Sequence, residues 1–191
     1  MTEARAKRRA DAERSRADIL AAATRLLAER PEVGLAAIAA AAGVTRQTVY
    51  AHFASREELL HAVIDHTTTQ AIAAMDAADL ESGTATAALL RMLDVGWQFF
   101  RQSPGPELLG AFAPQRDRER HVPVEDRLLK LIRRGHRTGE FDRTATAEWL
   151  VAAIIAVSHA AGEQVRSDRM SLEQAQETLR HTVLRLVRAA G

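Results

Sequence analysis

Apolar residues recur at helical spacing along almost the whole of this 191-residue sequence, and no stretch alternates apolar with polar residues as a strand would. Apolar residues make up 47% of the chain, which is enough for a substantial core. The sequence therefore predicts an all-α protein of about nine helices. Glycines that interrupt the pattern stand at Gly43, Gly83, Gly139 and Gly162.

The N-terminal third of the chain predicts a small unit of short helices. A first helix is expected over about residues 15–29 and a second over residues 35–42. Gly43 can take the left-handed conformation that ends the second helix, because glycine has no Cβ to strain there. The apolar stripe of the first helix consists of Ile19, Ala22, Ala23, Leu26 and Leu27.

Residues 45–53 predict a third helix and carry the most specific signal in the sequence. Thr45 can cap this helix, because its hydroxyl can accept a backbone N–H of the first turn. Val49 and Phe53 are four residues apart and therefore share one face. An apolar anchor with a hydrogen-bonding front is what a helix in a DNA major groove requires, so we interpret this segment as a recognition helix. The polar residues that point elsewhere are Arg46, Gln47, Thr48, Tyr50 and His52.

A fourth helix is expected to begin after Ser55, with Glu58 three residues later completing a capping box. Its length carries it out of the first unit and into the rest of the chain. We therefore expect it to link the two parts mechanically. Its apolar stripe consists of Leu59, Leu60, Val63, Ile64, Thr67, Ala71, Ile72 and Met75.

The next segments are expected to alternate between helices and connections. Residues 84–102 are rich in large apolar side chains and predict a helix. A short helix is expected over residues 107–112, and the charged residues 115–121 are expected to form a loop. Pro123 suits the first turn of a further helix that ends near Thr138.

The last two helices are expected over about residues 144–167 and 172–189, with Thr144 and Ser171 as their caps. The first of these helices is apolar on nearly every side, which is typical of a helix that is buried all round. One small domain seldom surrounds a helix completely. We therefore expect these two helices to meet a copy of themselves across a two-fold axis.

The charge of the chain is unevenly distributed. A net charge of +1 does not by itself indicate a nucleic-acid-binding protein. Residues 1–16, however, carry six basic and three acidic side chains, a balance of 6 − 3 = +3. Two interpretations are open: this segment is a solvated tail, or it is an arm that lies along DNA phosphates.

Several kinds of chemistry find no support in the sequence. The absence of cysteine removes disulfides, thiolate chemistry and most structural zinc sites. His61 and His66 are five residues apart, which does not place both on one helical face, so we expect no metal site and no cofactor. No nucleophile elbow, glycine-rich phosphate loop or isolated carboxylate pair occurs, and we expect no enzyme.

No membrane segment is expected either. The first residues are mostly charged residues and alanine rather than an apolar leader. The longest apolar run, Trp149 to Val157, is too short to span a bilayer. We expect a cytoplasmic protein with no membrane partner.

A known family shares the segments Ala42-Gly43-Val44-Thr45, Tyr50, His52-Phe53 and Ser55-Arg56-x-Glu58-Leu59. With these residues the chain closely resembles the TetR family of transcriptional regulators over about residues 15–62. The resemblance implies a helix-turn-helix domain over residues 15–62, preceded by a basic arm (1–14) and followed by a ligand-binding and dimerisation domain (63–191). It also implies a homodimer that represses at a palindromic DNA operator and is released when a small-molecule effector moves the fourth helix.

The resemblance also assigns roles to individual residues. Thr45, Tyr50 and His52 match positions that usually touch phosphates, and Arg56 stands where the family more often has a phosphate-binding lysine. The base-reading positions fall on Arg46, Gln47 and Thr48. Arginine pairs naturally with guanine and glutamine with adenine, although contact with the DNA backbone remains open for both.

Two segments depart from the family pattern. The second helix usually opens with Thr or Ser, but here the segment is Gly34-Leu35-Ala36, so that phosphate contact is either absent or supplied by backbone N–H groups. The glycine that is common after the first helix is replaced by Arg30-Pro31-Glu32. We expect these changes to alter DNA affinity rather than the fold.

Large side chains of the distal half are candidates for an apolar ligand cavity between helices. The alternative for each of them is plain core packing. For His159 and Trp149, the ligand site, the subunit interface and the core all remain open. The candidate ligand residues are Met92, Trp97, Phe100, Phe112 and His159.

Two other classes of protein fit parts of this sequence. One is an all-helical enzyme or small-molecule carrier that contains a helix-turn-helix, which a DNA gel shift and a turnover assay would distinguish. The other is an interaction module that uses its apolar helix to bind a different protein. Light scattering would then detect a monomer rather than a dimer.

Overall fold

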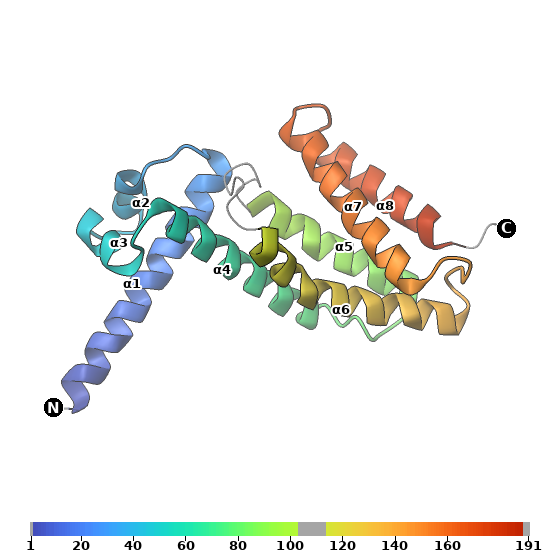
Figure 1. The fold of residues 1–191 in the computed structure, drawn as a ribbon, viewed down its shortest axis with the longest axis horizontal. Coiled ribbons are helices and arrows are strands. Elements are labelled where there is room, and N and C mark those ends of the chain that lie inside the picture. The colour runs from blue at the N-terminus through green and yellow to red at the C-terminus, as the bar shows by residue number, and fades with distance from the viewer. Residues whose placement is uncertain (1, 103–113, 189–191) are drawn as a thin grey trace. The chain divides into compact units, whose positions relative to one another are not determined.

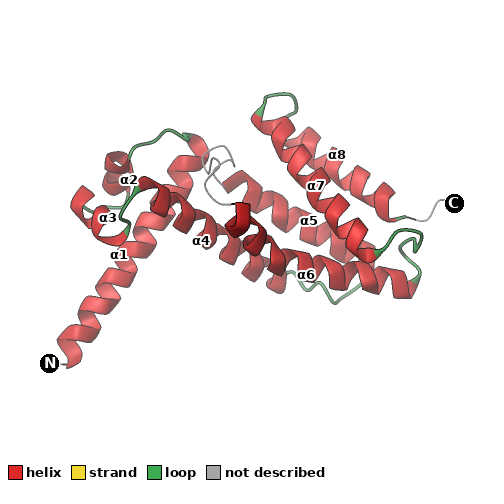
Figure 2. Cartoon of the chain, in the orientation of Figure 1, coloured by secondary structure: helices red, strands yellow, loops and turns green. Residues whose placement is uncertain are grey.

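The computed structural model describes residues 2–102 and 114–188, and within these ranges it consists of helices, turns and loops without a strand (Figures 1 and 2). The prediction of an all-α fold is confirmed. The short helix predicted over residues 107–112 lies outside the described residues. The helices are α1 (Thr2–Glu29), α2 (Leu35–Ala41), α3 (Arg46–His52), α4 (Arg56–Ala77), α5 (Ala85–Gln102), α6 (Pro114–Thr138), α7 (Ala147–Arg166) and α8 (Leu172–Val187).

The described residues divide into two compact units. The first is built on residues up to Thr69, and the second on residues 70–100 and those from 114 onward. The division between these units falls within α4, and the predicted domain boundary after residue 62 stays a prediction. The chain therefore passes from one unit to the other through a continuous helix.

The first unit is a small bundle in which α1 packs against α2 and α3. Its core joins residues from all four of its helices, so the short helices α2 and α3 are stabilised by packing rather than by their own length. The largest fully buried side chains in this core are Ile19, Leu27, Ile38, Val49, Phe53 and Leu59.

α1 begins at Thr2, well before the predicted start at residue 15. The prediction followed the apolar stripe, which begins only at Ile19. The preceding residues are mostly alanine, arginine, lysine and glutamate, all strong helix formers, so the helix continues without an apolar face. Residue 15, the predicted start, lies in the middle of this helix.

The second unit contains α5 to α8 and the end of α4. α7 packs against both α6 and α8, and together with α5 they enclose the larger of the two cores. The buried side chains at the centre of this core include Leu89, Leu131, Ile132, Ile154, Leu179 and Val183.

A glutamate from the α6–α7 connection caps α5. The Glu140 carboxylate accepts hydrogen bonds from the backbone N–H groups of Ala85 (2.9 Å) and Thr86 (3.0 Å), which belong to the first turn of α5. A carboxylate is favourable at a helix N-terminus, because the amides there have no partner within the helix. These bonds, that of Thr86 first, hold the pKa of Glu140 below its ordinary value.

α6 corrects the prediction of a charged loop over residues 115–121. The helix begins at Pro114, runs through those residues and ends at Thr138. Proline is favoured at the first position of a helix, and the charged residues that follow are good helix formers. Pro123 consequently lies inside the helix rather than at its first turn.

The N-cap of α7 is Thr146 rather than the predicted Thr144. The Thr146 hydroxyl accepts a hydrogen bond from the Trp149 N–H (3.2 Å). Thr144 instead donates its backbone N–H to the Asp142 carboxylate (3.0 Å), which closes a turn just before the helix. Ser171 caps α8 as predicted, and Gln174 completes a capping box there.

One face of α7 is exposed in the single chain. Trp149 is 67% exposed, and Ala152, Ala156 and Ala160 follow it on the same side of the helix. The expectation that α7 is buried all round is therefore not met within one chain. On α8, Leu172 and Leu186 are also exposed, each at 37%.

Of the helices in the described part of the chain, none has the length and the apolar character needed to cross a membrane.

Candidate DNA-binding surface

α2 and α3 are joined by a tight turn that depends on glycine. Gly43 has a φ of 67°, in the left-handed region that favours glycine. The Val44 N–H donates to the Ala39 carbonyl (3.0 Å), which fixes the direction in which the chain leaves α2. The start of α2 lacks a side-chain cap, because its N-cap residue is Gly34.

Local hydrogen bonds and one buried anchor position α3. The Thr48 N–H donates to the Thr45 hydroxyl (3.1 Å), and the hydroxyls of Thr45 and Thr48 are 2.8 Å apart. Val49 is fully buried, and the Phe53 N–H donates to the Val49 carbonyl (2.9 Å). The predicted cap and the predicted apolar face are both confirmed.

The remaining face of α3 carries the polar side chains predicted to meet DNA. Arg46, Gln47 and Tyr50 are exposed, and Thr48 and His52 are half-buried. The guanidinium of Arg46 lies over the Tyr50 ring, 5.6 Å from its centroid, and one of its nitrogens donates to the Tyr50 hydroxyl (3.3 Å). The structure therefore brings a cation and a phenol together on the exposed side of this helix.

Arg56 has a role that the sequence did not reveal. Its guanidinium donates to the backbone carbonyls of Val33 and Pro31, the second at 2.9 Å. A planar guanidinium can bond two carbonyls in a way that a single ammonium group cannot, so arginine suits this position better than lysine. The contact ties the α1–α2 loop to the start of α4. The predicted phosphate contact of Arg56 stays a prediction.

The start of α4 forms a variant of the predicted capping box. The Ser55 hydroxyl accepts a hydrogen bond from the Glu58 N–H (3.0 Å). The Glu58 carboxylate accepts one in return, but from the Ala54 N–H (2.7 Å) rather than from Ser55. These two bonds fix the turn between the end of α3 and α4.

The residues predicted to line a ligand cavity are only partly brought together. Met92 and Trp97 are buried in the core of the second unit. Trp97 stacks on the half-buried Phe100, with ring centroids 5.0 Å apart. His159 is exposed and meets His121 edge to face at 5.3 Å. Phe112 lies outside the described residues, and a ligand role for this set stays a prediction.

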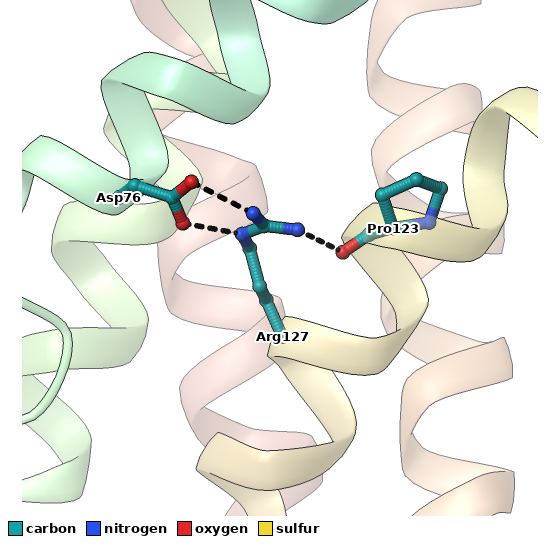
Figure 3. Close-up of polar contacts among 3 residues, drawn as sticks. All are labelled: Asp76, Pro123 and Arg127. Carbon is teal, nitrogen blue, oxygen red and sulfur yellow. Dashed lines mark hydrogen bonds and ion pairs between the residues drawn. The ribbon is translucent and has the colours of Figure 1, made fainter.

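The end of α4 is fastened to α6 by an ion pair (Figure 3). The Arg127 guanidinium donates to both oxygens of Asp76, at 2.7 and 2.8 Å, and its third nitrogen donates to the Pro123 carbonyl (2.8 Å). The hydrogen bond from Arg127 holds the pKa of Asp76 below its ordinary value. Arg127 thus orients the end of the helix that connects the two units.

The described residues do not gather the ligands of a metal centre. In that part of the chain, no three histidine, aspartate or glutamate side chains lie close enough together to hold a metal ion.

The helix-turn-helix region matches a known family model. Residues 19–63 match the model for bacterial regulatory proteins of the TetR family. The helix-turn-helix region of this chain belongs to the TetR family. The sequence-based prediction of this family is confirmed, and the matched residues cover most of α1 together with α2, α3 and the first part of α4.

Individual TetR-family proteins resemble this chain in sequence and in fold. The transcriptional repressor LfrR of Mycolicibacterium smegmatis is 44% identical over 82 residues, which is 43% of this chain and 43% of LfrR. The crystal structure of LfrR from Mycobacterium smegmatis in complex with proflavine has a TM-score of 0.68 at 25% identity, covering 93% of this chain and 99% of that one. The alignment with the curated LfrR sequence thus spans less than half of that protein's length.

A second solved structure matches in fold alone. The TetR-family regulator PfmR from Thermus thermophilus has a TM-score of 0.66 at 22% identity. The match covers 91% of this chain and 98% of PfmR. The arrangement of helices in this chain is therefore that of the TetR family beyond the helix-turn-helix region.

Proposed function

We propose that this protein is a transcriptional repressor that binds a palindromic DNA operator as a homodimer and leaves it when a small molecule binds. The observation that carries the proposal is the arrangement of α3. Exposed Arg46, Gln47 and Tyr50 lie on a helix whose other face is anchored by buried Val49, within residues that match the TetR family model. Such a helix fits the DNA major groove.

The side chains of this surface divide into two roles. Arg46, Gln47 and Thr48 read base edges, with Arg46 suited to guanine and Gln47 to adenine. Thr45, Tyr50, His52 and Arg56 contact phosphates, which fix the position of the protein on the duplex without reading its sequence. The Arg46–Tyr50 contact supports this division, since it orders the arginine before DNA arrives.

A second copy of the chain supplies the two-fold symmetry that a palindrome requires. The exposed face of α7, with Trp149 and a row of alanines, is apolar. Its small alanine side chains would let another helix approach closely. Leu172 and Leu186 on α8 are also exposed apolar side chains. Two copies joined here would present two recognition helices to successive major grooves, roughly 34–36 Å apart.

Release by a small molecule rests on the second unit and on α4. LfrR, whose structure was solved with proflavine, shares this fold and supports a ligand site among the helices of the second unit. Trp97 and Phe100, which stack on each other, offer aromatic surface for such a ligand. A ligand that favours one position of α4 shifts the DNA-bound population, with a coupling typically of about 1–3 kcal/mol.

The test is to select DNA fragments from the source genome with the full-length protein and to measure their binding by gel shift. We expect a short palindromic sequence to be enriched and to be bound more tightly than random duplex by roughly 10³-fold or more. Light scattering on the free protein should give the mass of a dimer. Enrichment of no sequence, or a monomer that binds a single half-site, would overturn the proposal.

A further inference from the structure

Charged side chains are distributed unevenly around the first turns of α1, with one basic face and one mixed face. Arg5, Arg9, Ala12 and Arg16 follow one another at intervals of four, three and four residues. The three arginines therefore lie on one face of α1. The opposite face is mixed: Arg14 there forms an ion pair with Asp11 at 3.4 Å. The net charge of this segment is thus concentrated in one arginine stripe, defined here as Arg5, Arg9 and Arg16.

The arginine stripe continues the line of the helix that is buried further along. Positions 5, 9, 12 and 16 lead at the same spacing to Ile19, Ala23 and Leu27, which lie in the core of the first unit. The first turns of α1 extend past α2 and α3, and their described side chains are exposed (Figure 1). If another part of this protein covered the positions of the stripe, they would be apolar. They carry arginines instead, as expected for a face of α1 that no other described part of the protein covers.

The stripe also begins beside the recognition helix. The Arg16 guanidinium lies over the ring of Phe53, 5.2 Å from its centroid, and Phe53 is the C-cap residue of α3. Along the helix axis, Arg9 and Arg5 lie about 10 and 16 Å beyond Arg16, given a rise of about 1.5 Å per residue. The positive stripe thus leads away from one end of the candidate DNA-binding surface.

We propose that the N-terminal turns of α1 form a second DNA-contacting element, in which Arg5 and Arg9 bind phosphates next to those reached from α3. This inference rests on the proposed function and extends the DNA contact beyond the helix-turn-helix. The arm is a helix continuous with the core, so its arginines are held in line before binding. Less ordering entropy is then lost than with a flexible tail.

The composition of the segment favours DNA over other partners. Alanine is its one apolar residue type from Thr2 to Asp18, so the segment has no large side chain to bury in a bilayer or against another protein. Duplex DNA, with one negative charge per about 1.7 Å of helix axis, matches a line of arginines directly.

The experiment compares two double variants of the full-length protein. Arg5→Ala with Arg9→Ala removes two charges from the stripe. Lys7→Ala with Arg14→Ala removes two charges from outside it. Alanine is at least as good a helix former as arginine or lysine, so both variants keep α1. Circular dichroism verifies this before any binding is measured.

Binding is measured over a range of salt concentrations, both on a fragment selected by the wild-type protein and on random-sequence duplex. For the stripe variant we expect weaker binding to both DNAs. The slope of log affinity against log salt should become shallower by about 0.9 for each phosphate that the variant no longer neutralises. The control variant should keep nearly the wild-type slope.

The outcomes separate this inference from the proposed function. Equal decreases in affinity for the two variants would mean that only the overall charge matters, and would overturn the inference. An unchanged affinity in the stripe variant would overturn it too, while leaving the operator-binding function in place. If the wild-type protein bound neither DNA, both proposals would fail.

Discussion

Asp76 and Arg127 hold each other through two parallel hydrogen bonds, so that the last turns of α4 are joined to α6 (Figure 3). Two parallel bonds fix the relative orientation of the groups as well as their distance. α4 begins just after α3 and ends at this pair, so the pair fixes the second-unit end of the helix on which the proposed release from DNA rests.

Replacement of Asp76 by Asn should lower thermal stability at neutral pH. The folded-state pKa of Asp76 is lowered from its ordinary value of 3.8, chiefly by the hydrogen bond from Arg127. A carboxylate with a lowered pKa stabilises the fold above its unfolded pKa, and that contribution is lost as the pH falls through the folded pKa. The difference in melting temperature between wild type and Asp76→Asn should therefore shrink once the pH falls below 3.8.

The control for this prediction is Glu81→Gln, which removes a nearby exposed carboxylate that lies outside the Asp76–Arg127 pair. Melting temperatures followed by circular dichroism across the pH range provide the measurement. A pH-independent difference, or no difference at neutral pH, would contradict the assigned role of the ion pair.

Gln47→Ala and Tyr50→Ala should impair DNA binding in different ways. Loss of a base-reading side chain changes which operator is preferred, typically by about 1–3 kcal/mol for one base pair. Removal of a neutral phosphate-binding side chain weakens binding to all sequences alike but changes the salt slope little, because no charge that neutralises a phosphate is lost. Repeating the fragment selection with each variant checks this. An unchanged preference with Gln47→Ala would remove that residue from base reading.

Gly162→Ala should destabilise the second unit. A Cβ at this position would lie 2.5 Å from the Phe100 ring, far inside van der Waals contact. We expect a decrease of about 1–3 kcal/mol in unfolding free energy, which is usual for an overpacked core. Denaturant unfolding measures it. Gly96→Ala is the matched control, because its Cβ would meet nothing within 4 Å and alanine favours a helix.

Trp149→Glu should dissociate the proposed dimer. A charge placed in an apolar interface would be buried without a partner, at a cost that a modest interface does not offset. Val122→Glu serves as the control, since Val122 is also an exposed apolar side chain but belongs to α6 rather than to α7. Sedimentation of both variants provides the measurement. A Trp149→Glu protein that stays dimeric would place the interface elsewhere.

Features that depend on neighbouring residues were predictable from the sequence. The caps at Thr45, Ser55 and Ser171 each form within one turn of the helix that they begin, and Gly43 adopts the left-handed conformation expected of it. The buried and exposed faces of α3 follow from residue spacing alone. The family resemblance was strong for the same reason, because its motif is short and local.

Features that depend on distant residues were not predictable. The hydrogen bonds from Arg56 to Pro31 and Val33 join positions at least 23 residues apart, and no local sequence pattern predicts them. The start of α1 and the start of α6 were misplaced because charged residues form helices as readily as loops, and the choice depends on their surroundings. The candidate ligand residues belong to the same class: the sequence shows which of them are large and apolar, but a ligand role depends on how the helices pack.

The cap on α5 also has a consequence for the order in which the nascent chain can mature. Ala85 and Thr86 leave the ribosome well before their partner, because Glu140 is 55 residues downstream of Ala85. Until that carboxylate has emerged, the first turn of α5 has only its local cap, the Thr84 hydroxyl that accepts from the Ala87 N–H (3.1 Å). Residues up to Thr69, on which the first unit is built, have by then been synthesised. Synthesis of the first unit thus ends well before α5, in the second unit, can gain its contact with Glu140.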